Sequence, residues 1–377
     1  MGGWKRPLSY DSLPREPFQR LAGSLREIGY CPERAAECLA LGGTDELYPL
    51  DYRYLPRWDD LLSQRPDDLS PAVRLLLLGL PVETARIKES LGSEQTGFLI
   101  GTGLAFESGG MLHPRLSIVP FGDLLVATDR LFMNADPESA EPGLSSDNCV
   151  WRLDRTTLLM SRKMRRDVTG EVLELGCGSG VLSLLTAKAC PEHGRRSAKH
   201  VTGVDINPRA VNVAGFNARL NGAENVEFLQ GGLYAPAKGK RFDYIFSNPP
   251  SAPGLVRGWN REGGATGWEM VEEMLKGVGG HLKPGGVFQT TMHFGYREKG
   301  DIGSWAGNLA GSGRHEITYD LLGEEEDAET FALREAWQKA GPRDYGLYLR
   351  TYRQYSENLG KAGMARLCFG LLTAEGR

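Results

Sequence analysis

The fold of this chain is decided by the stretch EVLELGCGSG at residues 171–180. Three apolar residues in its first half predict a buried strand, which runs from Glu171 to Leu175. Glycines follow at Gly176, Gly178 and Gly180, and glycine lets a backbone turn sharply and approach a ligand closely. Their Gly-x-Gly-x-Gly spacing differs from the Gly-x-Gly-x-x-Gly of dinucleotide-binding proteins. The stretch therefore predicts a strand, a ligand-binding turn and the start of a helix.

Strand patterns alternate with helical patterns from residue 171 onward, which predicts a mainly parallel sheet and an α/β fold. Asn207 is expected to cap the helix after the second strand, because Pro208 suits the first helical position. Seven strands are expected, at residues 171–175, 200–205, 226–229, 242–247, 287–292, 316–322 and 364–373.

A second motif, Asn248-Pro249-Pro250-Ser251, follows the fourth expected strand. In an open α/β sheet the carboxyl ends of the strands meet at one edge, where ligands bind. The glycine turn and this motif are therefore expected to face one site.

The glycine turn and Asn248-Pro249-Pro250 together resemble the class I S-adenosylmethionine-dependent methyltransferases, in the branch marked by Asn-Pro-Pro-aromatic. That branch includes RNA, DNA and protein-glutamine methyltransferases. The glycine-rich runs at 263–267 and 282–286 follow in the order seen in the branch, and the resemblance covers residues 171–292. It implies a seven-stranded Rossmann-like sheet, S-adenosylmethionine as methyl donor or as substrate, and no metal. Ser251 departs from the pattern, because the branch has an aromatic residue there.

Several residues are expected to bind the cofactor. Glu174 suits an ammonium group and would repel a pyrophosphate, because like charges repel. Asp205 can accept hydrogen bonds from both ribose hydroxyls, although it could also simply cap a helix. Ile206 and Leu233 are expected to cover the two faces of the adenine. The full expected set is Glu174, Gly176, Cys177, Gly178, Gly180, Asp205, Ile206, Leu233 and Asn248.

The expected catalytic residues are Asn248, Pro249, Ser251 and Tyr234. The resemblance implies that the Asn248 side chain and the Pro249 carbonyl orient an NH2 group, so that catalysis is mainly positioning. Ser251 cannot stack on a flat group, and its hydroxyl is expected to bond a carboxylate or amine of the acceptor. Tyr234 is either a core ring or part of an aromatic wall beside a sulfonium. His293 ends the fifth strand as an isolated histidine, which favours a structural role over the alternative role of a base.

The first 133 residues are expected to form a helical, winged-helix-like accessory domain with small strands at 98–100, 104–106, 115–119 and 124–128. Residues 134–147 are rich in turn-forming residues and are expected to form a linker. Residues 148–377 would then be the cofactor-binding domain, with a helical insertion at 323–363.

Composition is that of an ordinary soluble globular protein, with 41% hydrophobic and 24% charged residues among 377. A net charge of −4 makes nucleic acid an unexpected partner. The six scattered cysteines suggest reduced thiols. With no signal peptide or membrane-length apolar run, a cytoplasmic protein without membrane contact is expected. The oligomeric state stays open.

Three functions remain open. The favoured one is methyl transfer to nitrogen of a small molecule, because Ser251 replaces the stacking ring. The first alternative is a cyclase or lyase that converts S-adenosylmethionine to azetidine-2-carboxylate and methylthioadenosine. The second alternative is an RNA or protein-glutamine N-methyltransferase.

Overall fold

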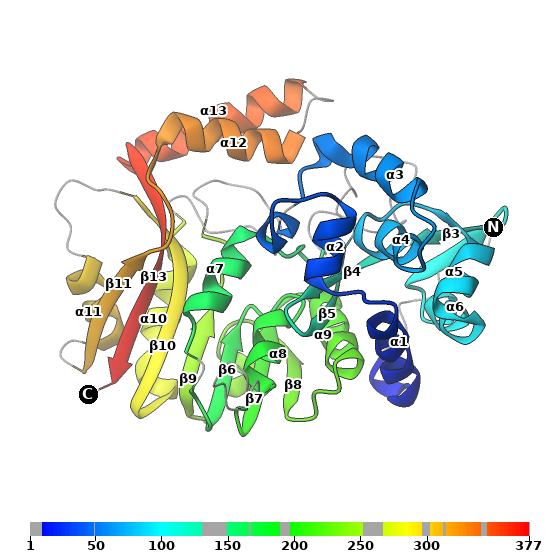
Figure 1. Ribbon diagram of the computed structural model, residues 1–377. Coiled ribbons are helices and arrows are strands. Elements are labelled where there is room, and N and C mark those ends of the chain that lie inside the picture. The colour runs from blue at the N-terminus through cyan, green and yellow to red at the C-terminus, as the bar shows by residue number, and fades with distance from the viewer. Residues whose placement is uncertain are drawn as a thin grey trace. The chain divides into compact units, whose positions relative to one another are not determined.

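The computed structural model describes residues 10–48, 50–129, 149–165, 167–188, 197–251, 267–295, 302–311, 314–340 and 345–376 (Figure 1). The expected linker at 134–147 lies outside these residues. The chain divides into two compact units. The first comprises Met1–Leu158, Cys177–Ala189 and Asn207–Phe228, and the second comprises Leu159–Gly176, Cys190–Ile206 and Leu229–Arg377. The boundaries expected from the sequence remain a prediction.

The first unit is mostly helical. Its helices are α1 (Glu16–Glu27), α2 (Pro32–Cys38), α3 (Leu55–Ser63), α4 (Leu69–Ala72), α5 (Thr84–Leu91), α6 (Ser93–Gly101), α8 (Val181–Ala187) and α9 (Pro208–Leu220). Its small sheet has the order β1 (Val82–Glu83), β3 (Met111–Pro114) and β2 (Ala105–Ser108). A separate hairpin joins β4 (Leu116–Phe121) to β5 (Leu124–Asp129). Short 3-10 turns lie at Tyr10–Ser12, Thr44–Leu47 and Tyr52–Tyr54, and a π turn at Val73–Leu77.

Helix α9 belongs to the first unit because two buried asparagines bind strand β5. The Asn217 side chain accepts from the Ala127 N–H at 2.7 Å and donates to the Ala127 carbonyl at 3.0 Å. Asn221 makes the same pair of bonds with Leu125. At its other end α9 begins as predicted, with Asn207 accepting from the Arg209 N–H at 3.0 Å.

One expected strand is wrong. Residues 98–100 lie in α6, where the Phe98 ring packs edge-on against Phe18 at 5.0 Å and Leu99 is fully buried. A three-residue apolar run fits a strand or a buried helix face equally well, and tertiary packing selects the helix.

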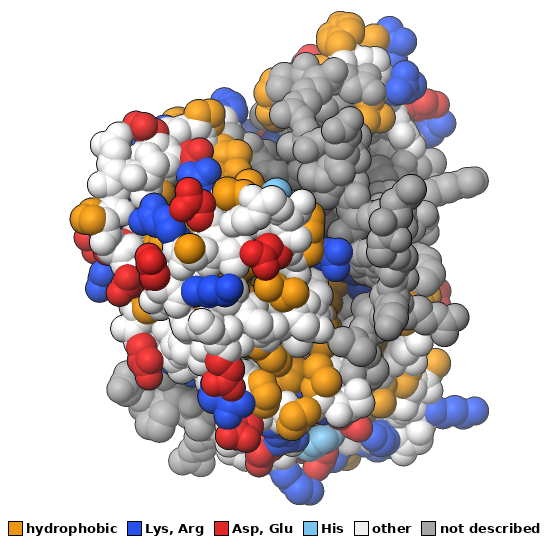
Figure 2. Space-filling view, turned by 90° about the vertical axis from the view of Figure 1, so that its right-hand side faces the viewer, with side chains coloured by type: hydrophobic (Ala, Val, Ile, Leu, Met, Phe, Trp, Pro, Cys, Tyr) orange, Lys and Arg blue, Asp and Glu red, His pale blue; other side chains and the backbone are white. Residues whose placement is uncertain are grey.

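On the face shown in Figure 2, acidic and basic side chains are interspersed among the described residues.

The second unit is built on a sheet with strand order β11-β13-β10-β9-β6-β7-β8. Strand β6 pairs in parallel with β7 and β9, and β10 pairs in parallel with β9. Strand β13 runs antiparallel to β10, β11 and β12. The strands are β6 (Glu171–Leu175), β7 (His200–Asp205), β8 (Val226–Gln230), β9 (Phe242–Ser247), β10 (Leu282–Gly295), β11 (His315–Leu321), β12 (Glu326–Asp327) and β13 (Arg366–Gly376). All seven predicted strands are confirmed, and with them the Rossmann-like α/β fold.

The strand order reverses between β6 and β9. From β6 the chain moves outward through β7 and β8, and it then returns to the other side of β6 to add β9 and β10. Ligands of open α/β sheets bind at such a switch point, outside the carboxyl ends of the strands. Gly176 follows β6 and Asn248 follows β9, so the two sequence motifs begin at neighbouring strand ends.

An apolar core covers one face of this sheet. It includes strand residues such as Phe288 and Met292 together with residues of α10 (Glu269–His281) and α11 (Ile302–Gly311), and residues of α12 (Ala328–Ala340) and α13 (Tyr345–Lys361) extend the same cluster. Helices α12 and α13 lie together beyond the carboxyl end of β10 (Figure 1), and β12 joins α12 to the start of β13. They come from the stretch between β11 and β13.

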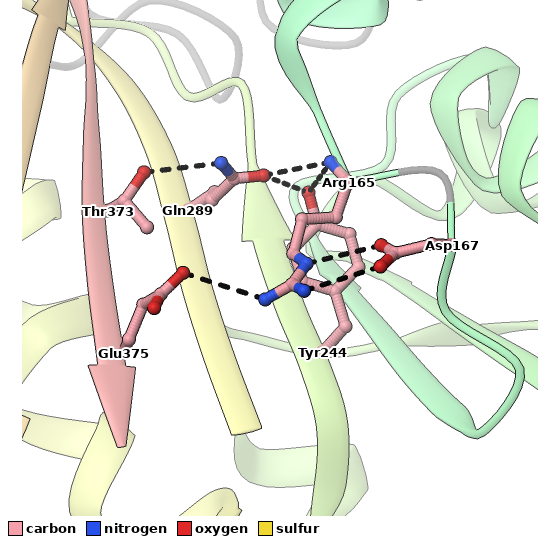
Figure 3. A network of polar contacts seen from close by, with 6 residues as sticks. All are labelled: Arg165, Asp167, Tyr244, Gln289, Thr373 and Glu375. Atoms are coloured by element: carbon pink, nitrogen blue, oxygen red, sulfur yellow. Dashed lines mark hydrogen bonds and ion pairs between the residues drawn. The ribbon is translucent and has the colours of Figure 1, made fainter. Parts of the chain in front are cut away.

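A buried polar network lies on the opposite face (Figure 3). The Tyr244 hydroxyl donates to Gln289 Oε1 at 2.6 Å, and Gln289 Nε2 donates to Thr373 Oγ1 at 3.2 Å. The Arg165 backbone N–H donates to the same Gln289 oxygen at 3.0 Å. Burial raises the pKa of Tyr244 well above its ordinary value, so the hydroxyl stays a donor. The network ties the segment after α7 (Arg155–Lys163) to β9, β10 and β13.

Candidate functional site

Polar side chains from four strand ends lie on one face of the sheet. Glu174 is in register with Gly203 on β7 and with Phe246 on β9, and Phe246 is in register with Gln289 on β10. Side chains alternate along a strand, so the positions two residues further on share that face. Those positions are Asp205, Asn248 and Thr291. The register thus brings three carboxylate or amide groups to one side of the carboxyl edge.

The glycine turn has the backbone shape that its sequence predicts. Gly176 has φ +70°, is exposed, and donates its N–H to the Val204 carbonyl at 2.8 Å. Gly178 has φ +53°, and Cys177 between them is buried. A Cβ added at Gly180 would lie 2.6 Å from Phe228 Cζ, so this position excludes a larger residue. An exposed backbone in this conformation fits close approach of a ligand.

The end of β7 joins a carboxylate to an exposed apolar side chain. Asp205 is buried, and its backbone carbonyl accepts from the Gly231 N–H at 2.9 Å. Ile206 beside it is 50% exposed. Leu233 has φ +45°, an unfavourable conformation for a residue with a branched side chain. A carboxylate that can accept from two hydroxyls, next to an exposed apolar side chain, suits a ribose and its base.

Tyr234 lies in the core and not beside Asn248. Its hydroxyl donates to the Met274 carbonyl at 2.8 Å, and its ring stacks on His281 at 4.3 Å. A Cβ added at Gly277 of α10 would lie 2.1 Å from the ring, so only glycine at this position leaves room for Tyr234. Burial raises the pKa of Tyr234 well above its ordinary value. These contacts give Tyr234 the surroundings of a packing residue.

Asn248 is oriented by a neighbouring strand. The Thr291 hydroxyl, fully buried on β10, donates to Asn248 Oδ1 at 2.5 Å. Pro249 next to it is buried, and Asn248 and Pro250 are partly exposed. The sequence gives no signal for Thr291, because the two bonded residues are 43 positions apart.

Ser251 has a partner that the sequence did not reveal. Its hydroxyl oxygen lies 3.0 Å from His293 Nδ1, and the residue is only 3% exposed. His293 is therefore not isolated at the end of β10, although the sequence suggested so. Because Ser251 is buried and bonded to His293, the structure does not support the expected contact between its hydroxyl and an acceptor.

The described residues contain no cluster of three or more His, Cys, Asp or Glu side chains arranged to hold a metal ion. Within the same residues, no helix combines the length and apolar character needed to cross a bilayer.

Comparison with known proteins gives a consistent set of relatives. A family model described as methyltransferase small domain matches residues 141–299. A putative protein N5-glutamine methyltransferase of Methanocaldococcus jannaschii is 30% identical over 173 residues, which cover 44% of this chain and 78% of that protein. The release factor glutamine methyltransferase of Koribacter versatilis is 35% identical over 144 residues, covering 35% of this chain and 48% of that protein. That of Xylella fastidiosa is 33% identical, covering 38% and 54%.

The chain thus spans about half the length of the release factor methyltransferases that it matches. Among solved structures, the YcgJ protein of Bacillus subtilis is 17% identical with a TM-score of 0.40, covering 59% of this chain and 98% of that one. The relatives correct one expectation. A small molecule was the favoured substrate from the sequence, whereas these relatives are named for a protein substrate.

Proposed function

Because the chain belongs to the S-adenosylmethionine-dependent methyltransferases with a methyltransferase small domain, we propose that it methylates the side-chain amide nitrogen of a glutamine in a protein. The observation that carries this proposal is Asn248 at the switch point of the sheet, with its amide held by Thr291. The names of the relatives support the substrate class.

Asn248 and Pro249 suit the recognition of a primary amide. An amide NH2 group offers two N–H donors, and the Asn248 side chain and the Pro249 carbonyl offer two oxygen acceptors. An amide oxygen accepts two hydrogen bonds, so the bond from Thr291 is compatible with a second one from an acceptor. Two bonds fix both the position and the tilt of the nitrogen, which is where rate is gained in a positioning mechanism.

The cofactor would be held by the residues at the ends of β6, β7 and β8. Asp205 would accept from the ribose hydroxyls, and Ile206 and Leu233 would cover the base. Glu174 and the glycine turn that starts at Gly176 would face the methionine end. S-adenosylmethionine supplies a sulfonium-bound methyl group, whose C–S bond breaks as a C–N bond forms and the amide nitrogen loses a proton to solvent.

The proposal is tested by incubating the protein with methyl-labelled S-adenosylmethionine and a purified release factor. We expect one added methylene mass on a glutamine, located by peptide mass spectrometry. Asn248→Ala should abolish the product, and Glu316→Gln, an exposed change on β11, should not. Label in added RNA instead, or methylthioadenosine released without any acceptor, would contradict the proposal in favour of one of the two other reactions.

A further inference from the structure

His293 contacts four other segments of the second unit. Its Nδ1 lies 3.0 Å from the Ser251 hydroxyl, and its backbone carbonyl accepts from Trp268 Nε1 at 2.9 Å. Its ring packs edge-on against Phe331 of α12 at 5.4 Å and lies tilted against Phe369 of β13 at 5.1 Å. Two phenyl rings thus contact the imidazole while its Nδ1 lies within hydrogen-bond distance of Ser251.

The Ser251 hydroxyl faces the protein interior. It is 3% exposed, and a hydrogen bond in such a poorly solvated place is electrostatically stronger than one in water. Leaving either partner unpaired there costs its full desolvation. The bond from Ser251 to His293 therefore stabilises the turn formed by residues 248–251.

Strand β10 holds both ends of this turn. Thr291 binds Asn248 at one end, and His293, two residues further along β10, binds Ser251 at the other. Pro249 and Pro250 lie between the two bonds, and each proline fixes its own backbone φ. The Pro249 carbonyl is therefore held between two fixed points.

We propose that His293 is a positioning residue for the acceptor, acting through Ser251 on the Asn248–Ser251 turn. This inference rests on the proposed function, because it concerns the residues that orient the glutamine amide. Phe331 belongs to α12, so the helices between β11 and β13 support the imidazole. The pair of His293 and Ser251 stabilises the turn in a protein that lacks an aromatic residue after Pro250.

Two variants separate the ring of His293 from its hydrogen bond. Phenylalanine keeps an aromatic ring against Phe331 but lacks Nδ1. Asparagine lacks the ring but carries a polar atom on Cγ, where histidine carries Nδ1. We expect His293→Phe and Ser251→Ala each to lower kcat for glutamine methylation about tenfold, as for one lost buried hydrogen bond. His293→Asn should recover most of that loss. S-adenosylhomocysteine affinity, measured by calorimetry, should stay within about twofold in all three.

The double variant Ser251→Ala/His293→Phe gives the sharper test. Its kcat should match the worse single variant, because both changes break the same bond. Additive losses, or single variants with wild-type kcat, would overturn the inference while leaving the proposed function intact.

Absence of glutamine methylation by the wild-type protein is a different result, since it defeats the proposed function itself. His293 is then judged by the 15N resonances of its imidazole, assigned from the signal missing in His293→Phe, which need no acceptor. A changed Nδ1 chemical shift in Ser251→Ala supports the hydrogen bond between Ser251 and His293, and an unchanged chemical shift overturns it.

Discussion

Strands β9 and β10 carry polar side chains at both ends. Those at the amino end bind neighbouring strands, and those at the carboxyl end bind the turn that follows β9. At the amino end, Asp243 Oδ2 accepts from Lys283 Nζ at 2.8 Å and from the Glu171 N–H at 2.7 Å, which joins three strands to one another. At the carboxyl end, the bonds from β10 reach Asn248 and Ser251, which lie beyond the last residue of β9. The first set fixes the sheet, and the second fixes a turn that the sheet presents.

This contrast predicts that stability and activity separate along the same two strands. Changes at the amino end and in the middle should lower the free energy of unfolding and leave cofactor binding and turnover intact. Changes at the carboxyl end should lower activity by more than their effect on stability explains.

Asp205→Ala at the carboxyl end of β7 should have the largest effect on binding. Loss of two charge-assisted hydrogen bonds to ribose is expected to weaken S-adenosylhomocysteine binding about 100-fold. Calorimetry measures the affinity, and an unchanged melting temperature serves as the control. Wild-type affinity in this variant would remove the proposed cofactor site.

Thr291→Val should affect turnover and not cofactor binding. Valine has nearly the shape of threonine but lacks the hydroxyl that orients Asn248. We expect kcat to fall about tenfold while S-adenosylhomocysteine affinity is kept. Equal losses in both quantities would mean that Thr291 supports the whole edge and not Asn248 alone.

Tyr244→Phe in the middle of the sheet should cost stability only. The change deletes the buried hydroxyl that donates to Gln289, although Gln289 keeps its bond from Arg165 (Figure 3). We expect the free energy of unfolding to fall by about 1 kcal/mol, read from urea denaturation. A clear fall in kcat for the folded variant would contradict the separation of stability from activity.

Asp243→Asn at the amino end should have the smallest effect. Burial raises the pKa of Asp243, but the bonds from Lys283 and the Glu171 N–H outweigh it and hold the pKa below its ordinary value. A depressed pKa gives stability that is present above the unfolded-state pKa of about 4 and is lost as pH falls through the folded-state value. Because the pair is over a third exposed, we expect less than about 1 kcal/mol at pH 7. The difference from wild type should vanish by acid titration, and persistence at low pH would refute the charge explanation.

The sequence predicts the local features of the sheet edge better than the contacts between distant residues. The glycine turn, the Asn207 cap and the strand ends are local, and each follows from residues within a few positions of one another. Thr291 and His293 act on partners 43 and 42 positions away, through the pairing of β10 with β9. No local pattern reports such contacts.

Distant contacts also explain the strand that the sequence wrongly predicts and the surroundings of Tyr234. The apolar run at 98–100 became helix because Phe98 packs on α1, 80 positions earlier. The sequence leaves Tyr234 either as a core ring or as part of an aromatic wall, and the missing side chain of Gly277 leaves room for the ring in the core. In both cases a distant neighbour decides between two outcomes that the local sequence leaves equal.

The most direct measurement is a single-turnover transfer of labelled methyl to a release factor glutamine, run with wild type and Asn248→Ala under saturating cofactor. We predict rapid transfer by the wild type and a rate lower by about 1000-fold in the variant, a far larger effect than any on its affinity for S-adenosylhomocysteine. Equal rates in the two proteins, or a wild type that binds no S-adenosylhomocysteine, would contradict a site in which the sheet presents Asn248 to an amide acceptor.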